Sequence, residues 1–206
     1  MVIKDPTYHL KDVEIIKRET AYNGFFKMEK LTLKHRLFEG GWTGEVNREL
    51  FVRGDAVAAT LYDPRHDLIG MIEQFRVGAL SEPYGPWCLE VVAGMIETGE
   101  TPEQVMRREL KEEANVVPER LDYIGNYLSS PGGSDEKLHL YCCQCDLSRV
   151  EGVFGLESEN EDIRVLTYPA QDVFANLFDG RFNNAATLIC LQWLQYNHQT
   201  LRREQL

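Results

Sequence analysis

The chain has 206 residues, of which 43% are hydrophobic and 27% charged, a balance typical of one sizeable globular domain or of a domain with a small appendage. A net charge of −11 argues against nucleic-acid binding, which needs a basic surface to neutralise phosphates. The sequence shows neither an apolar run near the roughly 18 residues of a membrane span nor a signal-peptide pattern, so we expect a cytoplasmic protein without a membrane partner.

Residues 1–50 read as a small strand-rich piece. Polar and apolar residues alternate within 12–50, most clearly in FKMEKLTLK at 26–34, and such alternation predicts short strands. A piece of about 50 residues buries too little surface to be stable alone. We therefore expect it to pack on a neighbour or on a partner subunit.

Residues 51–206 predict a mixed sheet flanked by helices. Apolar runs bounded by turn residues indicate the strands, and the final helix has apolar residues at the spacing of a packed helix face. The expected strands are 56–62, 68–77, 87–96, 121–128, 137–146 and 162–168, and the expected helices are 102–114, 170–178 and 184–198.

The cysteines Cys142, Cys143 and Cys145 lie close together in the sequence and allow two interpretations. A soft-metal site is one, but no second pair of ligands follows at a zinc-site spacing. A buried strand that uses cysteine as a small hydrophobic residue is the interpretation we favour. An odd number of five cysteines also suits free thiols in a reducing compartment.

The predicted helix 102–114 carries an unusual concentration of charge. Thr101, Pro102 and Gln104 form a typical helix start with a capping box. A period of 3.6 residues places Glu109 and Glu113 on one face, with Glu112 beside them, and like charges four residues apart repel. On its own, this run fits a solvated helix face; a hard cation such as Mg²⁺ is the other solution.

The longer segment 94–116, GMIETGETPEQVMRRELKEEANV, resembles the Nudix box. That motif consists of glycine, five residues, glutamate, seven residues, and then Arg-Glu-aliphatic-x-Glu-Glu-x-Gly-aliphatic. Only Asn115 departs from it, and asparagine is the usual second choice after glycine in the left-handed conformation that ends a helix. The segments VEIIKRET, IEQFRV, SSPGG, ENEDIRV and NNAATLICLQWLQ extend the similarity to the bacterial ADP-ribose pyrophosphatase branch of the family.

This resemblance implies an α+β Nudix fold, in which helices sandwich a mixed β-sheet, with a small strand-rich N-terminal domain. It also implies that a metal-activated water attacks the diphosphate of ADP-ribose and releases AMP and ribose 5-phosphate. Mg²⁺ is the expected cofactor, with Mn²⁺ as a substitute, and the expected assembly is a homodimer that shares its N-terminal piece. The alternatives are a hydrolase of another sugar nucleotide such as GDP-mannose and a non-catalytic module that senses ADP-ribose.

The same resemblance assigns residues to roles. Without it, the acidic run at 157–162 fits a solvated loop, Phe25 fits a core position and Arg48 a surface ion pair. The implied metal ligands are the Ala93 carbonyl, Glu109, Glu113 and Glu161, with Glu112 assisting; Arg108 is the brace that pairs with Glu100; Glu159 is the general base; and Phe25, Arg48, Arg76 and Glu136 contact the substrate.

Overall fold

The structure is a computed structural model that describes residues 3–204. The chain forms two compact units. The first contains residues up to Gly54 together with Leu128–Glu136, and the second contains Asp55–Tyr127 and the chain from Lys137 onward. The segment 128–136 thus joins the N-terminal unit, although it follows the strands of the second unit in the sequence. A functional division into two domains near residue 50 stays a prediction.

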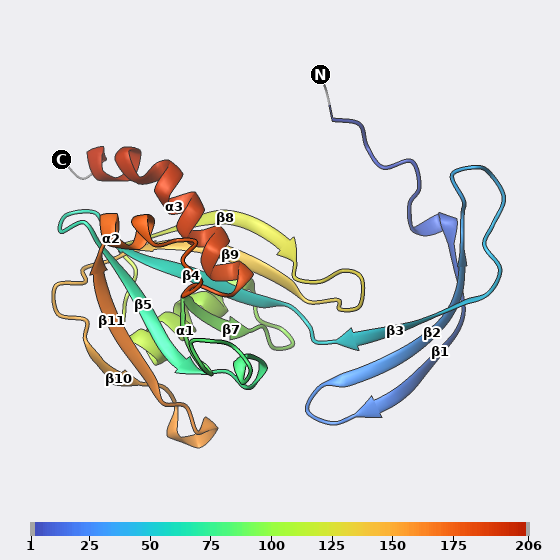
Figure 1. Cartoon of the computed structure of the whole chain (residues 1–206), viewed down its shortest axis with the longest axis horizontal. Helices are drawn as coiled ribbons and strands as arrows, with labels where there is room; N and C mark the ends of the chain where they lie inside the picture. The colour runs from blue at the N-terminus through green and yellow to red at the C-terminus, as the bar shows by residue number, and fades with distance from the viewer. Residues whose placement is uncertain (1–2, 205–206) are drawn as a thin grey trace. The chain divides into compact units, whose positions relative to one another are not determined.

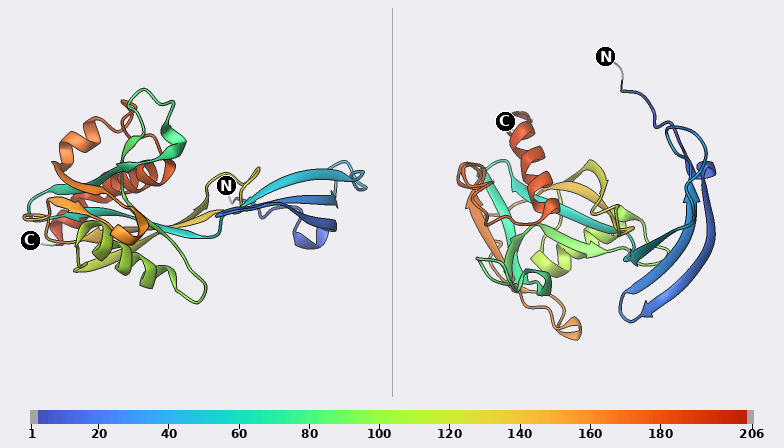
Figure 2. Two further views of the ribbon diagram at one scale, coloured as in Figure 1. Left: turned by 90° about the horizontal axis from the view of Figure 1, so that it is seen from below. Right: turned by 45° about the vertical axis from the view of Figure 1, so that its right-hand side comes forward.

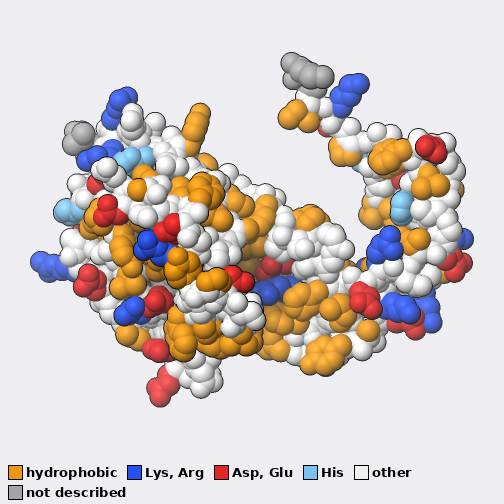
Figure 3. Space-filling model, in the orientation of Figure 1, with side chains coloured by type: hydrophobic (Ala, Val, Ile, Leu, Met, Phe, Trp, Pro, Cys, Tyr) orange, Lys and Arg blue, Asp and Glu red, His pale blue; other side chains and the backbone are white. Residues whose placement is uncertain are grey.

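The first unit is a three-stranded antiparallel sheet in the order β1-β2-β3. Its elements are a short 3-10 helix η1 (Leu10–Asp12) and strands β1 (Val13–Asn23), β2 (Lys27–His35) and β3 (Val46–Val52). All of β1 is exposed, and among the described residues of this unit only Glu29 and Leu31 are buried. Figure 3 shows hydrophobic side chains on the visible face of this sheet. The unit therefore lacks a core of its own.

The second unit is built on an eight-stranded mixed sheet (Figure 1). The order is β10-β11-β5-β4-β9-β8; the pairing of β4 with β9 is parallel, and β5 is antiparallel to both β4 and β11. The strands are β4 (Ala56–Asp63), β5 (Leu68–Phe75), β6 (Trp87–Glu90), β7 (Val92–Met95), β8 (Arg120–Leu128), β9 (Lys137–Gln144), β10 (Gly152–Phe154) and β11 (Ile163–Pro169).

The central strands β4 and β5 separate and leave room for two short strands. They pair with each other only where residues 61–63 face 68–70. Beyond that point, β7 pairs with the first half of β4, and β6 pairs with the second half of β5. The predicted strand 87–96 is thus two strands that bend at Val91 and serve different partners. Strand β7 is joined to the following helix by the loop 96–101, so this fork places the start of the charged segment beside β4.

Helices cover both faces of the sheet, as Figure 2 shows. Helix α1 (Pro102–Ala114) packs on one face, where Val57, Ala59 and Leu61 of β4 point. Helices α2 (Ala170–Ala175) and α3 (Ala185–Arg203) cover the other face, toward which Tyr62 points. The predicted mixed sheet between helices is confirmed. The helix expected at 170–178 ends early, at Ala175, while the last helix continues to Arg203.

Two further expectations concern the cysteines and the membrane. Cys142 and Cys143 lie in β9 and Cys145 directly after it, and all three are buried free thiols, as the strand interpretation predicts. Within residues 3–204, no helix combines the length and the apolar character that crossing a membrane requires.

Candidate active site

Helix α1 begins and ends as its sequence predicts. The Thr101 hydroxyl accepts a hydrogen bond from the Gln104 backbone N–H at 3.4 Å, and the Gln104 side chain accepts one from the Thr101 N–H at 2.9 Å. At the other end, Asn115 adopts the left-handed conformation with φ 52°. Asparagine therefore fills the place of the family glycine without changing the helix end.

Two glutamates of α1 turn toward the sheet. Glu113 is only 3% exposed, and its Oε2 accepts a hydrogen bond from the Ala93 N–H at 3.1 Å. Glu109 lies against Gly94 so closely that a Cβ at position 94 would be 2.1 Å from the Glu109 carboxylate oxygen. Glycine at 94 is therefore a packing requirement: it allows β7 to approach the carboxylates of α1.

The surroundings of these two carboxylates disfavour their charged form and so raise their pKa values. The pKa of Glu113 is raised to about 8: burial is the main cause, the charges of Glu109 and Glu161 add to it, and the Ala93 N–H and Arg76 act against it. The pKa of Glu109 is raised to about 7, mainly by burial; Arg108 lowers it, and the charges of Glu112 and Glu161 raise it. A divalent cation among these carboxylate oxygens would offset the repulsion and burial, and oxygen ligands are those that Mg²⁺ prefers. The residues present thus fit a bound cation.

Arg108 lies between the acidic side chains of this helix. Its guanidinium is 2.9 Å from Glu109, 3.0 Å from Glu112 and 3.5 Å from Glu100. Burial lowers the pKa of Arg108, but the surrounding carboxylates outweigh it and hold the value above the ordinary one. The supporting pair with Glu100 that the resemblance implies is therefore present. Arg108 also offsets part of the negative charge that would otherwise destabilise α1.

The second acidic segment, residues 157–162, is held by one hydrogen bond from the preceding Gly155 to α1 and by another from Leu156 to Glu161. The Gly155 N–H donates to the Glu112 carbonyl at 3.2 Å, and the Leu156 N–H donates to Glu161 Oε2 at 3.1 Å. A Cβ at Gly155, which has φ 104°, would lie 2.7 Å from the Glu161 Cβ. The charge of Glu161 reaches both Glu109 and Glu113. Glu159 stands exposed at the end of the 3-10 helix η3 (Glu157–Glu159).

Arg76 follows β5 and is held by partners that sequence reasoning missed. Its Nε donates to Glu90 Oε2 at 2.7 Å, and the other Glu90 oxygen accepts from Asn184 Nδ2 at 2.9 Å. Glu90 is 8% exposed. The positive charge of Arg76 lowers the pKa of Glu113, so Arg76 lies within electrostatic range of that carboxylate. The asparagine at the start of the predicted helix 184–198 was the one available signal, because asparagine is a preferred cap.

The remaining candidates lie in the N-terminal unit. Phe25 is 88% exposed and contacts Phe26 edge to face, with ring centroids 4.8 Å apart, so the alternative that Phe25 is a core residue is wrong. Arg48 donates to the Asn47 carbonyl at 2.8 Å. Glu136 is ion-paired with Arg53. Their contacts with a substrate stay predictions.

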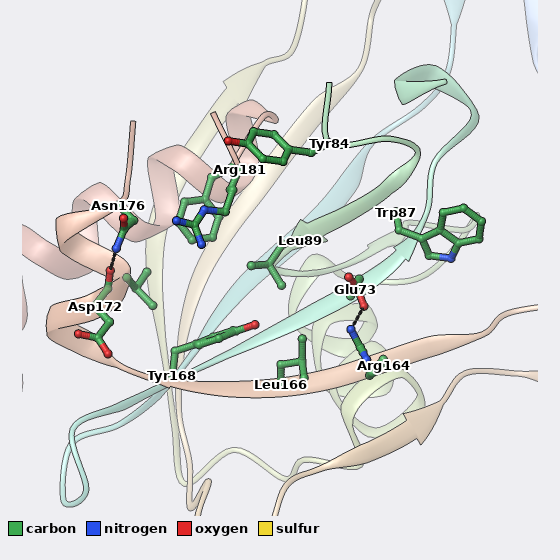
Figure 4. Close-up of a pocket in the computed structure, with 12 residues that line it drawn as sticks. Glu73, Tyr84, Trp87, Leu89, Arg164, Leu166, Tyr168, Asp172, Asn176 and Arg181 are labelled. Carbon is green, nitrogen blue, oxygen red and sulfur yellow. Dashed lines mark hydrogen bonds and ion pairs between the residues drawn. The ribbon is translucent and has the colours of Figure 1, made fainter. Parts of the chain in front are cut away.

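The structure also has a pocket of about 330 Å³ on the face of the sheet opposite α1 (Figure 4). Two arginines line the pocket, and both already have carboxylate partners. Arg164 is ion-paired with Glu73, and Arg181 with Asp179 at 2.7 Å. The pocket therefore presents little free positive charge for a diphosphate. None of the predicted site residues line it; its lining is Glu73, Tyr84, Trp87, Leu89, Arg164, Leu166, Tyr168, Asp172, Val173, Asn176, Arg181 and Phe182.

A second group with metal-ligand spacing, Asp63, His66 and Asp146, lies at the end of β4. Asp63 is fully buried, and its carboxylate accepts hydrogen bonds from the backbone N–H groups of Arg65, His66 and Leu147 and pairs with the His66 ring. Burial raises the pKa of Asp63, but these hydrogen bonds lower it below its ordinary value. The Asp63 carboxylate therefore has a structural role: its hydrogen bonds stabilise the turn between β4 and β5.

Comparisons with known proteins agree with the fold. The family model for the NUDIX domain matches residues 52–188, which is more than half of the chain, so the chain belongs to the Nudix family. The predicted family is therefore confirmed. A crystal structure of a protein described as an ADP compounds hydrolase superposes with a TM-score of 0.71 over 95% of this chain and all of that one. At 21% identity, this likeness supports the fold alone.

Curated relatives indicate which branch of the Nudix family the chain resembles most. The chain is 43% identical over 198 residues to the ADP-ribose pyrophosphatase of Escherichia coli K12, covering 96% of this chain and 95% of that protein. It is 40% identical to the ADP-ribose pyrophosphatase of Haemophilus influenzae, covering 94% and 90%. A GDP-mannose pyrophosphatase of Yersinia pestis is more distant, with 28% identity over 89% of this chain and 91% of that protein. The similarity thus favours the ADP-ribose branch that the sequence analysis predicts.

Proposed function

We propose that this protein hydrolyses the diphosphate linkage of ADP-ribose and releases AMP and ribose 5-phosphate. The observation that carries the proposal is the pair of the half-buried Glu109 and the buried Glu113 on α1, whose raised pKa values a cation beside the sheet would offset. The relatives at 40% and 43% identity, which are ADP-ribose pyrophosphatases, support ADP-ribose as the substrate. Mg²⁺ is the cation we expect, with Mn²⁺ as a substitute.

The residues that would hold the cations are Glu109, Glu113, Glu161 and the Ala93 carbonyl. When bound, divalent cations offset the charge of the diphosphate and acidify a water. Arg108 keeps Glu109 and Glu112 in place through contacts of 2.9 and 3.0 Å. Glu112 also fastens the second acidic segment, because its carbonyl accepts the Gly155 N–H.

Glu159 is the proposed general base, which takes the proton of the water that attacks phosphorus. Its place on a short turn between Gly155 and Glu161 supports this role, because both of these residues are anchored while the turn between them is exposed. Closure of such a turn over the substrate would exclude bulk water from the reaction.

Substrate contacts are proposed for Phe25, Arg48, Arg76 and Glu136. The exposed ring of Phe25 offers a surface for stacking the adenine, and the arginines offer charge to the diphosphate or a planar face to the base. Cytoplasmic localisation is part of the proposal, supported by five cysteines that are free and buried, as is usual in a reducing compartment.

A homodimer is also proposed, in which the N-terminal unit of one subunit completes the site of the other. The support is the exposed β1 strand, with Ile15 at 48%, Ile16 at 42% and Tyr22 at 64% exposure, in a unit without a core. Burial of such side chains is favourable in a stable interface. Light scattering is expected to give twice the chain mass of 23.7 kDa. A monomer at micromolar concentration would contradict the dimer.

The substrate is tested with a panel of nucleoside diphosphate sugars in the presence of Mg²⁺. We expect kcat/KM to be highest for ADP-ribose, and AMP to be released in step with ribose 5-phosphate. A preference for GDP-mannose would move the protein to the branch of its more distant relatives. Tight ADP-ribose binding without release of AMP would instead indicate a sensing module, an outcome that the complete set of carboxylates argues against.

A further inference from the structure

The side chain of Arg76 pairs with the buried Glu90, and the half-buried Asn184 in turn holds Glu90. Its Nε–H donates to Glu90 Oε2 at 2.7 Å, and Glu90 Oε1 accepts from Asn184 Nδ2 at 2.9 Å. Each oxygen of the Glu90 carboxylate therefore has a donor, which is what a buried carboxylate requires to remain charged. Arg76 directly follows β5, Glu90 is the last residue of β6, and Asn184 directly precedes α3.

The far end of this chain of contacts is fixed to the fold. The Asn184 side-chain Oδ1 accepts the Thr187 N–H at 2.9 Å and so caps α3, while the Thr187 hydroxyl accepts the Val91 N–H at 3.2 Å. The start of α3 is thus tied to residues 90 and 91 at two points. Both ends of the Asn184 side-chain amide are therefore used: Oδ1 caps the helix, and Nδ2 donates to Glu90 and orients it.

This arrangement leaves Arg76 suited to an anion. A guanidinium has five N–H donors in a fixed plane, and the hydrogen bond to Glu90 uses the Nε–H. The Arg76 side chain is 43% exposed and lies within electrostatic reach of Glu113. An unsupported arginine would lose rotamer freedom on binding, whereas one that is already held avoids much of that cost.

We propose that Glu90 and Asn184 are positioning residues that hold the Arg76 guanidinium ready for the nucleoside diphosphate substrate. The inference rests on the proposed function, since it assumes that Arg76 contacts the substrate. Neither residue touches the reacting atoms; both act through Arg76. The alternative is that the Arg76–Glu90 pair only joins β5 to β6.

A double-mutant cycle separates these two roles. Glu90→Gln and Asn184→Ser are each expected to raise KM about fivefold to tenfold with kcat within about twofold of wild type. Serine at 184 retains a capping oxygen for Thr187 but loses the donor to Glu90. Arg76→Ala should raise KM at least as much, and the double variant Arg76→Ala/Glu90→Gln should match Arg76→Ala alone. Independent effects that multiply in the double variant would overturn the inference, and so would an unchanged KM in both Glu90→Gln and Asn184→Ser.

The matched control is Glu73→Gln. Glu73 belongs to the same strand and also pairs with an arginine, Arg164, but on the opposite face of the sheet. Its KM should equal that of wild type. The cycle is run on whichever sugar nucleotide the wild-type protein hydrolyses, so failure of ADP-ribose as the substrate appears in wild type and remains distinct from failure of the coupling. If Glu90→Gln does not fold, the combination of Asn184→Ser with Arg76→Ala gives the same comparison.

Discussion

Glu113→Gln is expected to lower ADP-ribose turnover on the order of a hundredfold to a thousandfold, the usual effect of removing one preorganised charge contact. The same change should raise the thermal stability of the metal-free protein at pH 8. Glu113 is 3% exposed, and burial together with neighbouring carboxylates raises its pKa to about 8. Glutamine keeps the shape and the acceptor for the Ala93 N–H without the charge. Loss of activity with a gain in stability distinguishes a metal ligand from a packing residue.

The sign of the pH dependence follows from the raised pKa. Below the ordinary value of 4.5, Glu113 is protonated in both the folded and the unfolded chain, and the group costs nothing. As the pH rises toward 8, the unfolded chain ionises first, so this contribution to the free energy of unfolding falls. At about 1.4 kcal/mol per pKa unit, the loss amounts to a few kcal/mol at most. The stability difference between variant and wild type should therefore grow from pH 5 to pH 8.

Thermal denaturation with a chelator and with Mg²⁺ measures both effects. Mg²⁺ at a hundred times its dissociation constant should stabilise wild type by about 2.7 kcal/mol, and the variant much less. Glu103→Gln is the control, because Glu103 lies on the exposed side of α1 and pairs only with Arg107 among its described ion pairs. Turnover at the wild-type rate in Glu113→Gln would remove Glu113 from the proposed metal ligands.

The charged helix could be predicted because its determinants are local. The cap at Thr101, the left-handed Asn115 and the shared face of Glu109 and Glu113 all follow from one continuous segment with a 3.6-residue period. Within such a segment, each residue fixes the placement of the next. The sequence therefore identified both the helix and the face that carries the carboxylates.

The support of Arg76 could not be predicted in this way. Glu90 and Asn184, which hold Arg76 in place, are 94 residues apart in the sequence. Arg76 reaches Glu90 only because β6 pairs with the second half of β5. That register depends on the separation of β4 from β5, which has no local signal. The bend at Val91 has the same origin, since a continuous strand 87–96 would be the simplest interpretation of an apolar run.

Glu159→Gln is expected to lower kcat by roughly a hundredfold to ten-thousandfold, the range typical of losing a general base, while KM changes little. Glutamine cannot take a proton from the attacking water, but it is nearly the same size. The anchors on either side of the turn, Gly155 to the Glu112 carbonyl and Leu156 to Glu161, do not involve the Glu159 side chain and should persist. Steady-state kinetics with ADP-ribose and saturating Mg²⁺ measures both constants.

The control for this change is Glu157→Gln, which alters an exposed carboxylate at the first position of the same short helix. Both variants remove one negative charge from the same turn. If Glu159 itself is the base, only Glu159→Gln should lose kcat, and Glu157→Gln should keep the wild-type value. Mg²⁺-dependent stabilisation should be retained in Glu159→Gln, in contrast to Glu113→Gln, since a base does not hold the cation. An unchanged kcat in Glu159→Gln would refute the base assignment, and a lost response to Mg²⁺ would make Glu159 a metal ligand instead.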